Sequence, residues 1–353
     1  MEGLFINIDF PNTLSSGYIE GIVRGYRNDL LTGSQYMNLT QSDTLEDLKL
    51  QLSATGYGNF LANVPSPLAT SVIQEKAFGK LVDDFRYVRA QATEPLAKFM
   101  DFITHGYMID NVALLITGTV HDRDREEMLA RVHPLGWFES LPAISVATDI
   151  ASLYDMILID SPLAPYFKDN LSAEELDDLN IEVIRNKLYK AYLQEFYKFS
   201  QTLPSPTNEI MARLLEFEAD RRTINISINS IGTQLTREAR FSLFPEFGSL
   251  YPSAADVLSR AEDVEQIKFG IDTSGSPTVD SSLLDGSSNK SLEDHFYQKE
   301  MELCKAAFTQ QFTYSTVWAW IKTREQEIRN ITWIAECIAQ NQKDRVNNYI
   351  AVF

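Results

Sequence analysis

The sequence contains few of the residues from which active sites are usually built. Its 353 residues include two cysteines, Cys304 and Cys337, and four histidines. Two distant cysteines form neither a CxxC pair nor a disulfide framework, and they suit a reducing compartment such as the cytosol. No Walker A loop, GxGxxG motif, HExxH pair or GxSxG elbow occurs. We therefore expect no catalytic residue, no cofactor and no metal.

Basic side chains are also in short supply. Lysine and arginine total 31 against 49 aspartate and glutamate residues, which gives a formal net charge of -18. Such a surface repels phosphate backbones and anionic lipid headgroups. The charge predicts no nucleic-acid partner and no direct electrostatic docking on membranes, and it leaves basic protein partners open.

Long apolar runs are missing as well. The longest candidate membrane segment covers residues 112–116 and is flanked by Asp110 and Asn111, whereas a helical span needs about 20 apolar residues. The first residues also lack a basic segment followed by an apolar one, so no secretory signal is visible. We expect no direct membrane span.

Helical periodicity dominates what is present. Ile19, Val23, Tyr26 and Leu30 follow the spacing of one buried helix face. Residues 43 and 46 form a candidate capping box before another helix. Residues 291–353 read as helical almost throughout, but one rod of that length would span roughly 90 Å, so we expect a break near 313–316. The fold class is all-α, and a flexible Ser/Gly-rich loop is predicted at 269–291.

Residues 103–127 collect histidines and carboxylates around an apolar stretch. His121, Asp122 and Asp124 could form a metal-dependent hydrolase site, but the arginines between them oppose cation binding and pair with the carboxylates. The interpretation that we prefer is a buried helix at 102–116 that ends in a polar turn.

A short pattern, E-x-[DE]-x-R-x-I, occurs at residues 218–224 and again at 325–331. The match is either chance or an internal repeat of one helical unit. Its paired carboxylates invite a general acid/base interpretation. Neighbouring arginines favour the ionised form, however, so we prefer buried ion-pair networks between helices.

Two large aromatic residues, Trp137 and Phe138, follow a turn punctuated by Pro134 and Gly136. Aromatic side chains at a turn can anchor a protein interface, or they can fill a gap between helices. Both interpretations remain open, and Trp137 with Phe138 is our candidate interface.

Several long strings carry a resemblance to a known family. They include GYIEGIVRGYRNDLL, FMDFITHGYMIDNVALLITGTVHDRD, HPLGWFESLPAISVATD, FEADRRTINISIN and STVWAWIKTREQEIRNITWIAECIAQNQKDRVNNYI. Together these strings resemble subunit d of the eukaryotic vacuolar-type proton ATPase, in a fungal style and over nearly the whole chain. That family is related to the C subunit of archaeal and bacterial rotary ATPases. Departures fall at residues 11–17 and 269–291.

The resemblance implies a single domain over residues 1–353, with a funnel-like assembly of three similar helical lobes. It further implies a non-catalytic subunit that caps the proteolipid ring of the membrane sector and couples it to the central stalk. The implied partners are the proteolipid ring, the central-stalk subunits and the large membrane subunit a. The implied location is the cytoplasmic face of the vacuolar membrane and other acidic endomembranes, as a peripheral membrane protein.

Two other classes of protein compete with this one. A cytosolic helical adaptor, such as a trafficking scaffold, would show regular repeats of about 34 to 47 residues, and the chain does not. An enzyme would use His121, Asp122 and Asp124 to bind a metal. Stoichiometric zinc or manganese in the purified protein would distinguish this class from the other two.

Overall fold

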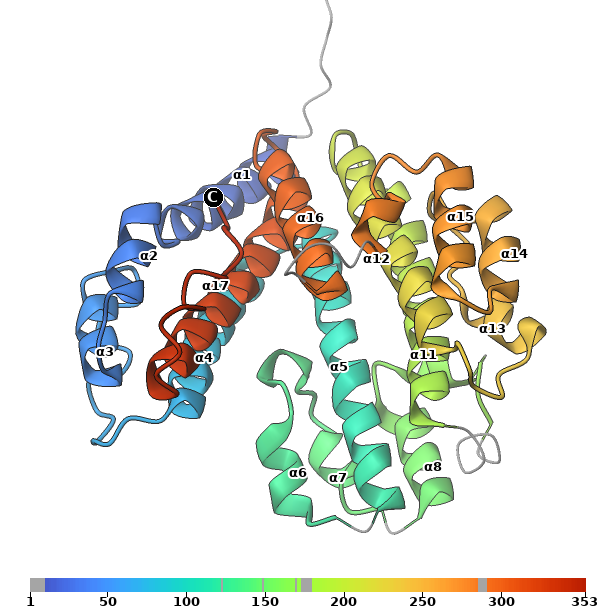
Figure 1. Ribbon diagram of the computed structural model, residues 1–353, viewed down its shortest axis with the longest axis horizontal. Helices are drawn as coiled ribbons and strands as arrows, with labels where there is room; N and C mark the ends of the chain where they lie inside the picture. The colour runs from blue at the N-terminus through green and yellow to red at the C-terminus, as the bar shows by residue number, and fades with distance from the viewer. Residues whose placement is uncertain (1–9, 122, 148, 169, 173–179, 285–290) are drawn as a thin grey trace, which may run out of the picture. The chain divides into compact units, whose positions relative to one another are not determined.

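The computed structural model describes residues 10–121, 123–147, 149–168, 170–172, 180–284 and 291–353. Every regular element in these ranges is helical, which confirms the predicted all-α class (Figure 1). The chain forms two compact units. The first comprises Met1–Met100, Ser205–Ile210 and Glu293–Phe353, and the second comprises Asp101–Pro204 and Met211–Leu292. The arrangement in three lobes stays a prediction.

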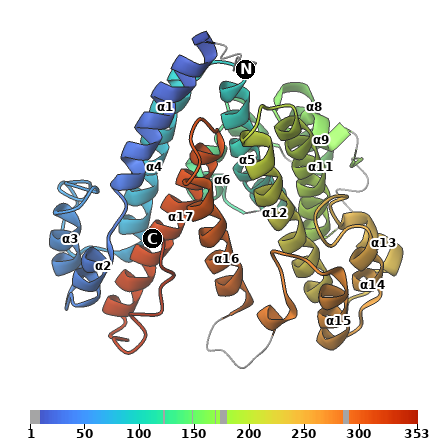
Figure 2. The same cartoon turned by 90° about the horizontal axis from the view of Figure 1, so that it is seen from above.

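The first unit is built on two helical ends of the chain that pack together. Its helices are α1 (Phe10–Asn28), α2 (Gly33–Thr40), α3 (Leu45–Ser53), α4 (Thr70–Gln91), α16 (Leu292–Ala307) and α17 (Ser315–Ala339). α17 packs against α1, α3 and α4 (Figures 1 and 2). Most of its side chains are buried, as expected of a central helix that is covered on several sides. Trp320 at its core stacks on Tyr26 of α1, with ring centroids 5.2 Å apart.

The second unit contains the remaining helices. They are α5 (Leu96–Val120), whose first turn belongs to the first unit, α6 (Arg125–Arg131), α7 (Leu141–Ile144), α8 (Ile150–Asp160), α9 (Ala164–Lys168), α11 (Ile181–Gln201), α12 (Thr207–Asn229), whose first turn also belongs to the first unit, α13 (Arg237–Leu243), α14 (Ser253–Arg260) and α15 (Val264–Ser274), with short 3-10 turns at Pro134–Gly136 and Ser281–Leu284.

Aromatic stacking fills the core between α5 and α11 in this second unit. Phe102 of α5 lies 5.1 Å from Phe196 and 5.0 Å from Phe199, measured between ring centroids. Phe196 and Phe199 are three residues apart on α11, which is the spacing of one helix face, so this face follows from the sequence pattern. Among the described residues, no helix combines the length and the apolarity that crossing a bilayer requires.

The structure confirms the predicted break in the C-terminal part and corrects two other boundaries. The break covers residues 308–314, between α16 and α17, and overlaps the predicted position near 313–316. The capping box of α3 uses Thr44 and Asp47 rather than residues 43 and 46. The predicted loop at 269–291 begins inside α15, because Asp263 caps that helix and Ile267 and Ile271 continue its buried face. Residues 285–290 of that prediction lie outside the described residues.

Candidate functional sites

The histidine-rich stretch lies mainly on α5. This helix continues through residues 117–119 to Val120, four residues beyond its predicted end, so it separates His105 from His121. His105 lies near the middle of the helix, and its Nδ1 is 2.8 Å from the Tyr166 hydroxyl. Burial lowers the pKa of His105 to about 4. The imidazole is therefore neutral at physiological pH, as expected of a core histidine.

Of the three candidate metal ligands, the structure describes His121 and Asp124, and it places neither in a metal site. Asp124 caps α6 by accepting the Glu127 amide at 3.0 Å, and His121 is exposed just after α5. Asp122 lies outside the described residues. Within the ranges that the structure describes, no group of three or more His, Cys, Asp or Glu side chains is placed to hold a metal. Cys304 and Cys337 are buried free thiols.

Hydrogen bonds to α5 fix the turn before the candidate interface. Asn111 accepts the His133 amide at 2.7 Å through Oδ1 and donates to the His133 carbonyl at 2.9 Å through Nδ2. The ring of Tyr107 stacks on His133, with centroids 4.4 Å apart. Trp137 is 44% exposed, whereas Phe138 is 7% exposed. Trp137 can therefore reach a partner, while Phe138 packs inside the unit.

Gly136 allows this turn to approach α5 closely. A Cβ built at Gly136 would lie 2.4 Å from the Tyr107 carbonyl carbon and 2.6 Å from Asn111 Nδ2. We expect Gly136→Ala to destabilise the fold by about 1–3 kcal/mol, because the extra methyl forces the backbone of the turn away from the helix. Urea denaturation of the purified variant measures this.

Gly106→Ala provides the matched control on α5. There the nearest atom to a new Cβ is 3.6 Å away on Tyr192, an ordinary contact. Replacing a helical glycine with alanine should stabilise by about 0.5–1 kcal/mol. Equal effects of the two substitutions would contradict the close-approach argument.

The two copies of E-x-[DE]-x-R-x-I occupy the long helices α12 and α17, one in each unit. Their central acids, Asp220 and Glu327, are both buried, and each accepts a backbone N–H from a segment distant in sequence. Their arginines also match. Arg222 lies over the ring of Tyr189 at 3.3 Å, and Arg329 over the ring of Tyr297 at 4.1 Å. The shared letters thus have shared structural roles.

Glu327 lies at the centre of a buried network in the first unit. Its Oε1 accepts from Arg324 at 2.7 Å and from the Tyr57 hydroxyl at 3.0 Å, while Oε2 accepts the Leu31 amide at 2.5 Å. Burial raises the pKa of the Glu327 carboxyl, and Arg324 with these donors opposes that rise. The ion pair is buried as predicted, but both of its members lie on α17 rather than on two helices. The Leu31 amide and the Tyr57 hydroxyl, not the ion pair, attach α17 to the segments after α1 and α3.

Asp220 in the second unit differs from this prediction, because its partners are not arginines. Its Oδ1 accepts the Leu250 amide at 3.0 Å, and its Oδ2 accepts the Ser249 amide at 3.2 Å and the Ser249 hydroxyl. Gly248, at φ 105°, lets this loop lie against the carboxylate, since a Cβ there would be 2.5 Å from Oδ1. Burial raises the pKa of Asp220 to about 6.

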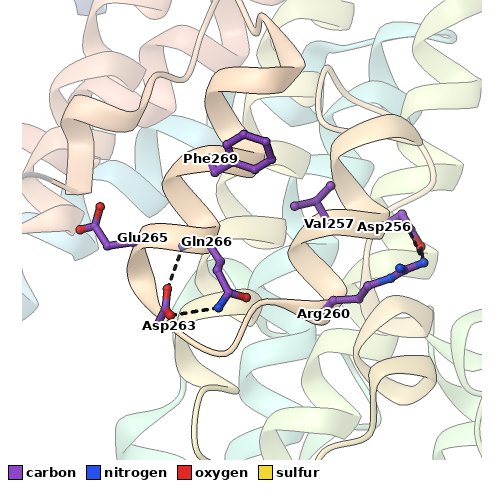
Figure 3. A pocket seen from close by; sticks show the side chains of 7 residues that line it. All are labelled: Asp256, Val257, Arg260, Asp263, Glu265, Gln266 and Phe269. Carbon is purple, nitrogen blue, oxygen red and sulfur yellow. Dashed lines mark hydrogen bonds and ion pairs between the residues drawn. The ribbon is translucent and has the colours of Figure 1, made fainter.

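A shallow groove of about 490 Å³ lies at the α14–α15 hairpin (Figure 3). Arg260 forms an ion pair with Asp256 at 2.9 Å, and Asp263 accepts from Gln266. Its carboxylates are therefore engaged in pairing or capping, and the groove shows no catalytic arrangement. The side chains that line it are Asp256, Val257, Arg260, Asp263, Glu265, Gln266 and Phe269.

The fold and these sites define an all-helical protein whose buried polar groups join helices and loops. Comparison with known proteins identifies the family within this class. Residues 19–349 match the family described as ATP synthase (C/AC39) subunit, and the chain belongs to this family of non-catalytic subunits.

The individual relatives agree with that assignment. The chain is 58% identical over 357 residues to the V-type proton ATPase subunit d of Saccharomyces cerevisiae, and 56% identical over 371 residues to that of Neurospora crassa. All of both chains is covered in each case. The C subunit of the A-type ATP synthase of Desulfurococcus is 19% identical over 333 residues, covering 91% of this chain and 86% of its own. The resemblance stated from the sequence is confirmed.

Proposed function

We propose that this chain is the subunit of a vacuolar-type proton ATPase that caps the proteolipid ring and receives the base of the central stalk. In this position it would couple ATP-driven rotation to proton transport and organelle acidification. The observation that carries the proposal is the identity above 50%, over the full length of both chains, to proteins named V-type proton ATPase subunit d.

The internal contacts of each unit suit a part that transmits torque. Such a part must resist deformation, and close-packed interiors have low compressibility. In the first unit, the Glu327 network joins α17 to segments 296 and 270 residues earlier in the chain. In the second, Asp220 holds the loop at Ser249 and Leu250 against α12. Both contacts oppose the sliding of one segment past another.

The proposed partners are the proteolipid ring, the large membrane subunit a and the central-stalk subunits. The formal charge of -18 favours a basic surface on the stalk. The proposed location is the cytoplasmic face of the vacuolar membrane and other acidic endomembranes, where the chain would be held by these proteins.

Affinity purification of the tagged full chain from detergent-solubilised membranes tests the proposal. We expect mass spectrometry to recover proteolipid, subunit a and central-stalk subunits in constant ratio to the tagged chain. Recovery of the chain alone, or only with soluble trafficking factors, would reject the proposal. In vesicles, loss of the chain should reduce proton pumping to background.

Trp137 and Phe138 should separate into different roles in the same assay. Trp137→Ala should leave the fold unchanged and weaken retention in the complex about tenfold, because an exposed tryptophan can anchor an interface. Phe138→Ala should instead destabilise the isolated protein by about 3–5 kcal/mol, since it opens a cavity. Urea denaturation and the subunit ratio in the purified complex measure the two effects. If the Trp137→Ala variant is retained in the complex as well as the wild type, Trp137 does not anchor the interface.

A further inference from the structure

The loop between α16 and α17 presents an aromatic side chain in an unusual way. Phe312 has φ 57°, a left-handed conformation that bulky residues rarely adopt. Its side chain is nevertheless 64% exposed, so the ring gains little from burial in return for this backbone strain. Strained residues persist where the surrounding structure holds them, and they concentrate at functional positions.

Two residues of α1 hold the start of this loop. The Glu20 carboxylate accepts the Phe312 amide at 2.7 Å through Oε2. Arg24 donates to the Phe308 carbonyl at 2.9 Å and also to the Gln310 carbonyl. Glu20 and Arg24 form an ion pair with each other at 2.7 Å. The two side chains thus fix the backbone on both sides of the exposed part of the loop.

Thr207 holds the end of the loop. Its Oγ1 accepts the Tyr314 amide at 3.1 Å and donates to the Thr313 hydroxyl at 3.2 Å. Because the loop is fixed at both ends, little backbone entropy remains to be lost when the Phe312 ring enters a partner. Such preorganisation strengthens binding without adding contacts.

The neighbours of Phe312 indicate the chemistry of what covers it. The exposed residues before it, Thr309, Gln310 and Gln311, are uncharged, in a chain of net charge -18. The charge of Arg24 nearby is paired with Glu20. Lipid-binding surfaces combine several apolar side chains with lysines or arginines, and this loop has neither. One rigid aromatic ring with an uncharged hydrogen-bonding rim fits a protein pocket instead.

We propose that Phe312 is an interface anchor that inserts into an apolar, uncharged pocket on another protein subunit of the same ATPase. This inference rests on the proposed function, since it takes its partner from that complex. Glu20, Arg24 and Thr207 position the anchor, and the ring makes the contact.

Three substitutions separate the ring from the backbone that carries it. Phe312→Asn removes the ring and keeps a residue that tolerates the left-handed conformation. Its thermal midpoint should match the wild type within about 2 °C or rise, because ordinary residues bear more strain there than asparagine. Phe312→Tyr keeps the ring, and Gln311→Ala alters the exposed neighbour alone.

Each variant would replace the native copy in cells, and the ATPase would be purified through a tag on a central-stalk subunit. We expect the ratio of this chain to the tagged subunit to fall at least tenfold for Phe312→Asn. The ratio should be unchanged for Phe312→Tyr and for Gln311→Ala. Equal retention of Phe312→Asn and the wild type would overturn the proposal, as would equal loss in Gln311→Ala.

A photocrosslinker identifies the partner directly. With p-benzoylphenylalanine in place of Phe312 in the assembled enzyme, we expect an adduct with one identified protein subunit. An adduct with lipid, or no adduct, would overturn the assignment to a protein pocket. Failure of the wild-type chain to copurify with any ATPase subunit would reject the proposed function itself. Copurification of the wild type with normal retention of Phe312→Asn would reject only the anchor.

Discussion

Replacing Glu327 with glutamine is expected to lower the free energy of unfolding of the isolated protein by about 3–5 kcal/mol. Arg324 is 2% exposed in its side chain and Glu327 is fully buried, so the substitution leaves a guanidinium cation inside the core without its counterion. The glutamine side chain also has one acceptor oxygen where the carboxylate has two, and the Tyr57 hydroxyl and the Leu31 amide both donate to that carboxylate. Urea denaturation of the purified variant measures the loss.

A surface pair provides the control for this prediction. Lys343 and Asp43 also form an ion pair in the first unit, but both side chains are largely exposed. Asp43→Asn should therefore change the free energy of unfolding by at most about 1 kcal/mol. An effect of Glu327→Gln no larger than that of Asp43→Asn would contradict the account of a buried, uncompensated charge.

A double substitution distinguishes charge pairing from packing. In Arg324→Met with Glu327→Met, neither ion remains, so the cost of an unpaired buried charge disappears. We expect the double variant to be more stable than Glu327→Gln, although the Leu31 amide still loses its acceptor at about 1–3 kcal/mol. Together with the single variants Arg324→Met and Glu327→Met, the double variant completes a double-mutant cycle whose non-additivity gives the coupling energy of the pair.

Much of the fold could be predicted from the sequence, because the long helices alternate buried and exposed residues with a helical period. The spacing of Ile19, Val23 and Tyr26 indicated α1 in this way, and the repeated pattern falls on the long helices α12 and α17. End points were less predictable. α5 continues through Thr117, Gly118 and Thr119, whose local preferences favour a turn, because tertiary packing overrides weak propensities.

The partners within the candidate sites could not be predicted, since they depend on contacts between distant segments. The sequence placed arginines near Asp220, but the folded chain brings the Ser249 and Leu250 amides to its carboxylate instead. It also gave no sign of Phe312. The left-handed backbone there depends on hydrogen bonds that the loop forms with Glu20 and Thr207, across 292 and 107 residues of sequence.

The matching roles of Asp220 and Glu327 favour an internal repeat over a chance match. Each acid lies on a long helix of its unit and accepts a hydrogen bond from a distant backbone amide. The arginine two positions later covers a tyrosine ring in both copies. Chance similarity of seven letters does not require the same kinds of contact. The copies nevertheless differ in their electrostatics, because Glu327 has a paired arginine and Asp220 has none.

The raised pKa of Asp220 predicts a pH response opposite to that of an acid whose pKa is lowered in the folded chain. Burial raises its pKa from the ordinary value of 3.8 to about 6 in the folded chain. The folded state therefore binds the proton more tightly than the unfolded state, and this group adds stability as the pH falls through 6 towards 3.8. The difference between the two pKa values corresponds to about 3 kcal/mol over the full range. Between pH 7 and 5 we expect a gain of about 1.3 kcal/mol.

Asp220→Asn isolates this contribution from all other titrating groups. The asparagine stays neutral, and its Oδ1 can still accept the Leu250 amide. When the pH falls from 7 to 5, the free energy of unfolding of the wild type should therefore rise by about 1.3 kcal/mol relative to that of the variant. Glu216, one turn earlier on α12, is the neighbouring carboxylate that raises the pKa further, and it is present in both proteins. Urea titrations at the two pH values, with hydrogen exchange of the Leu250 amide as a local probe, measure the shift. If the two stability curves run parallel, Asp220 titrates below this range, and its hydrogen bonds to Ser249 and Leu250 outweigh the cost of burying its charge.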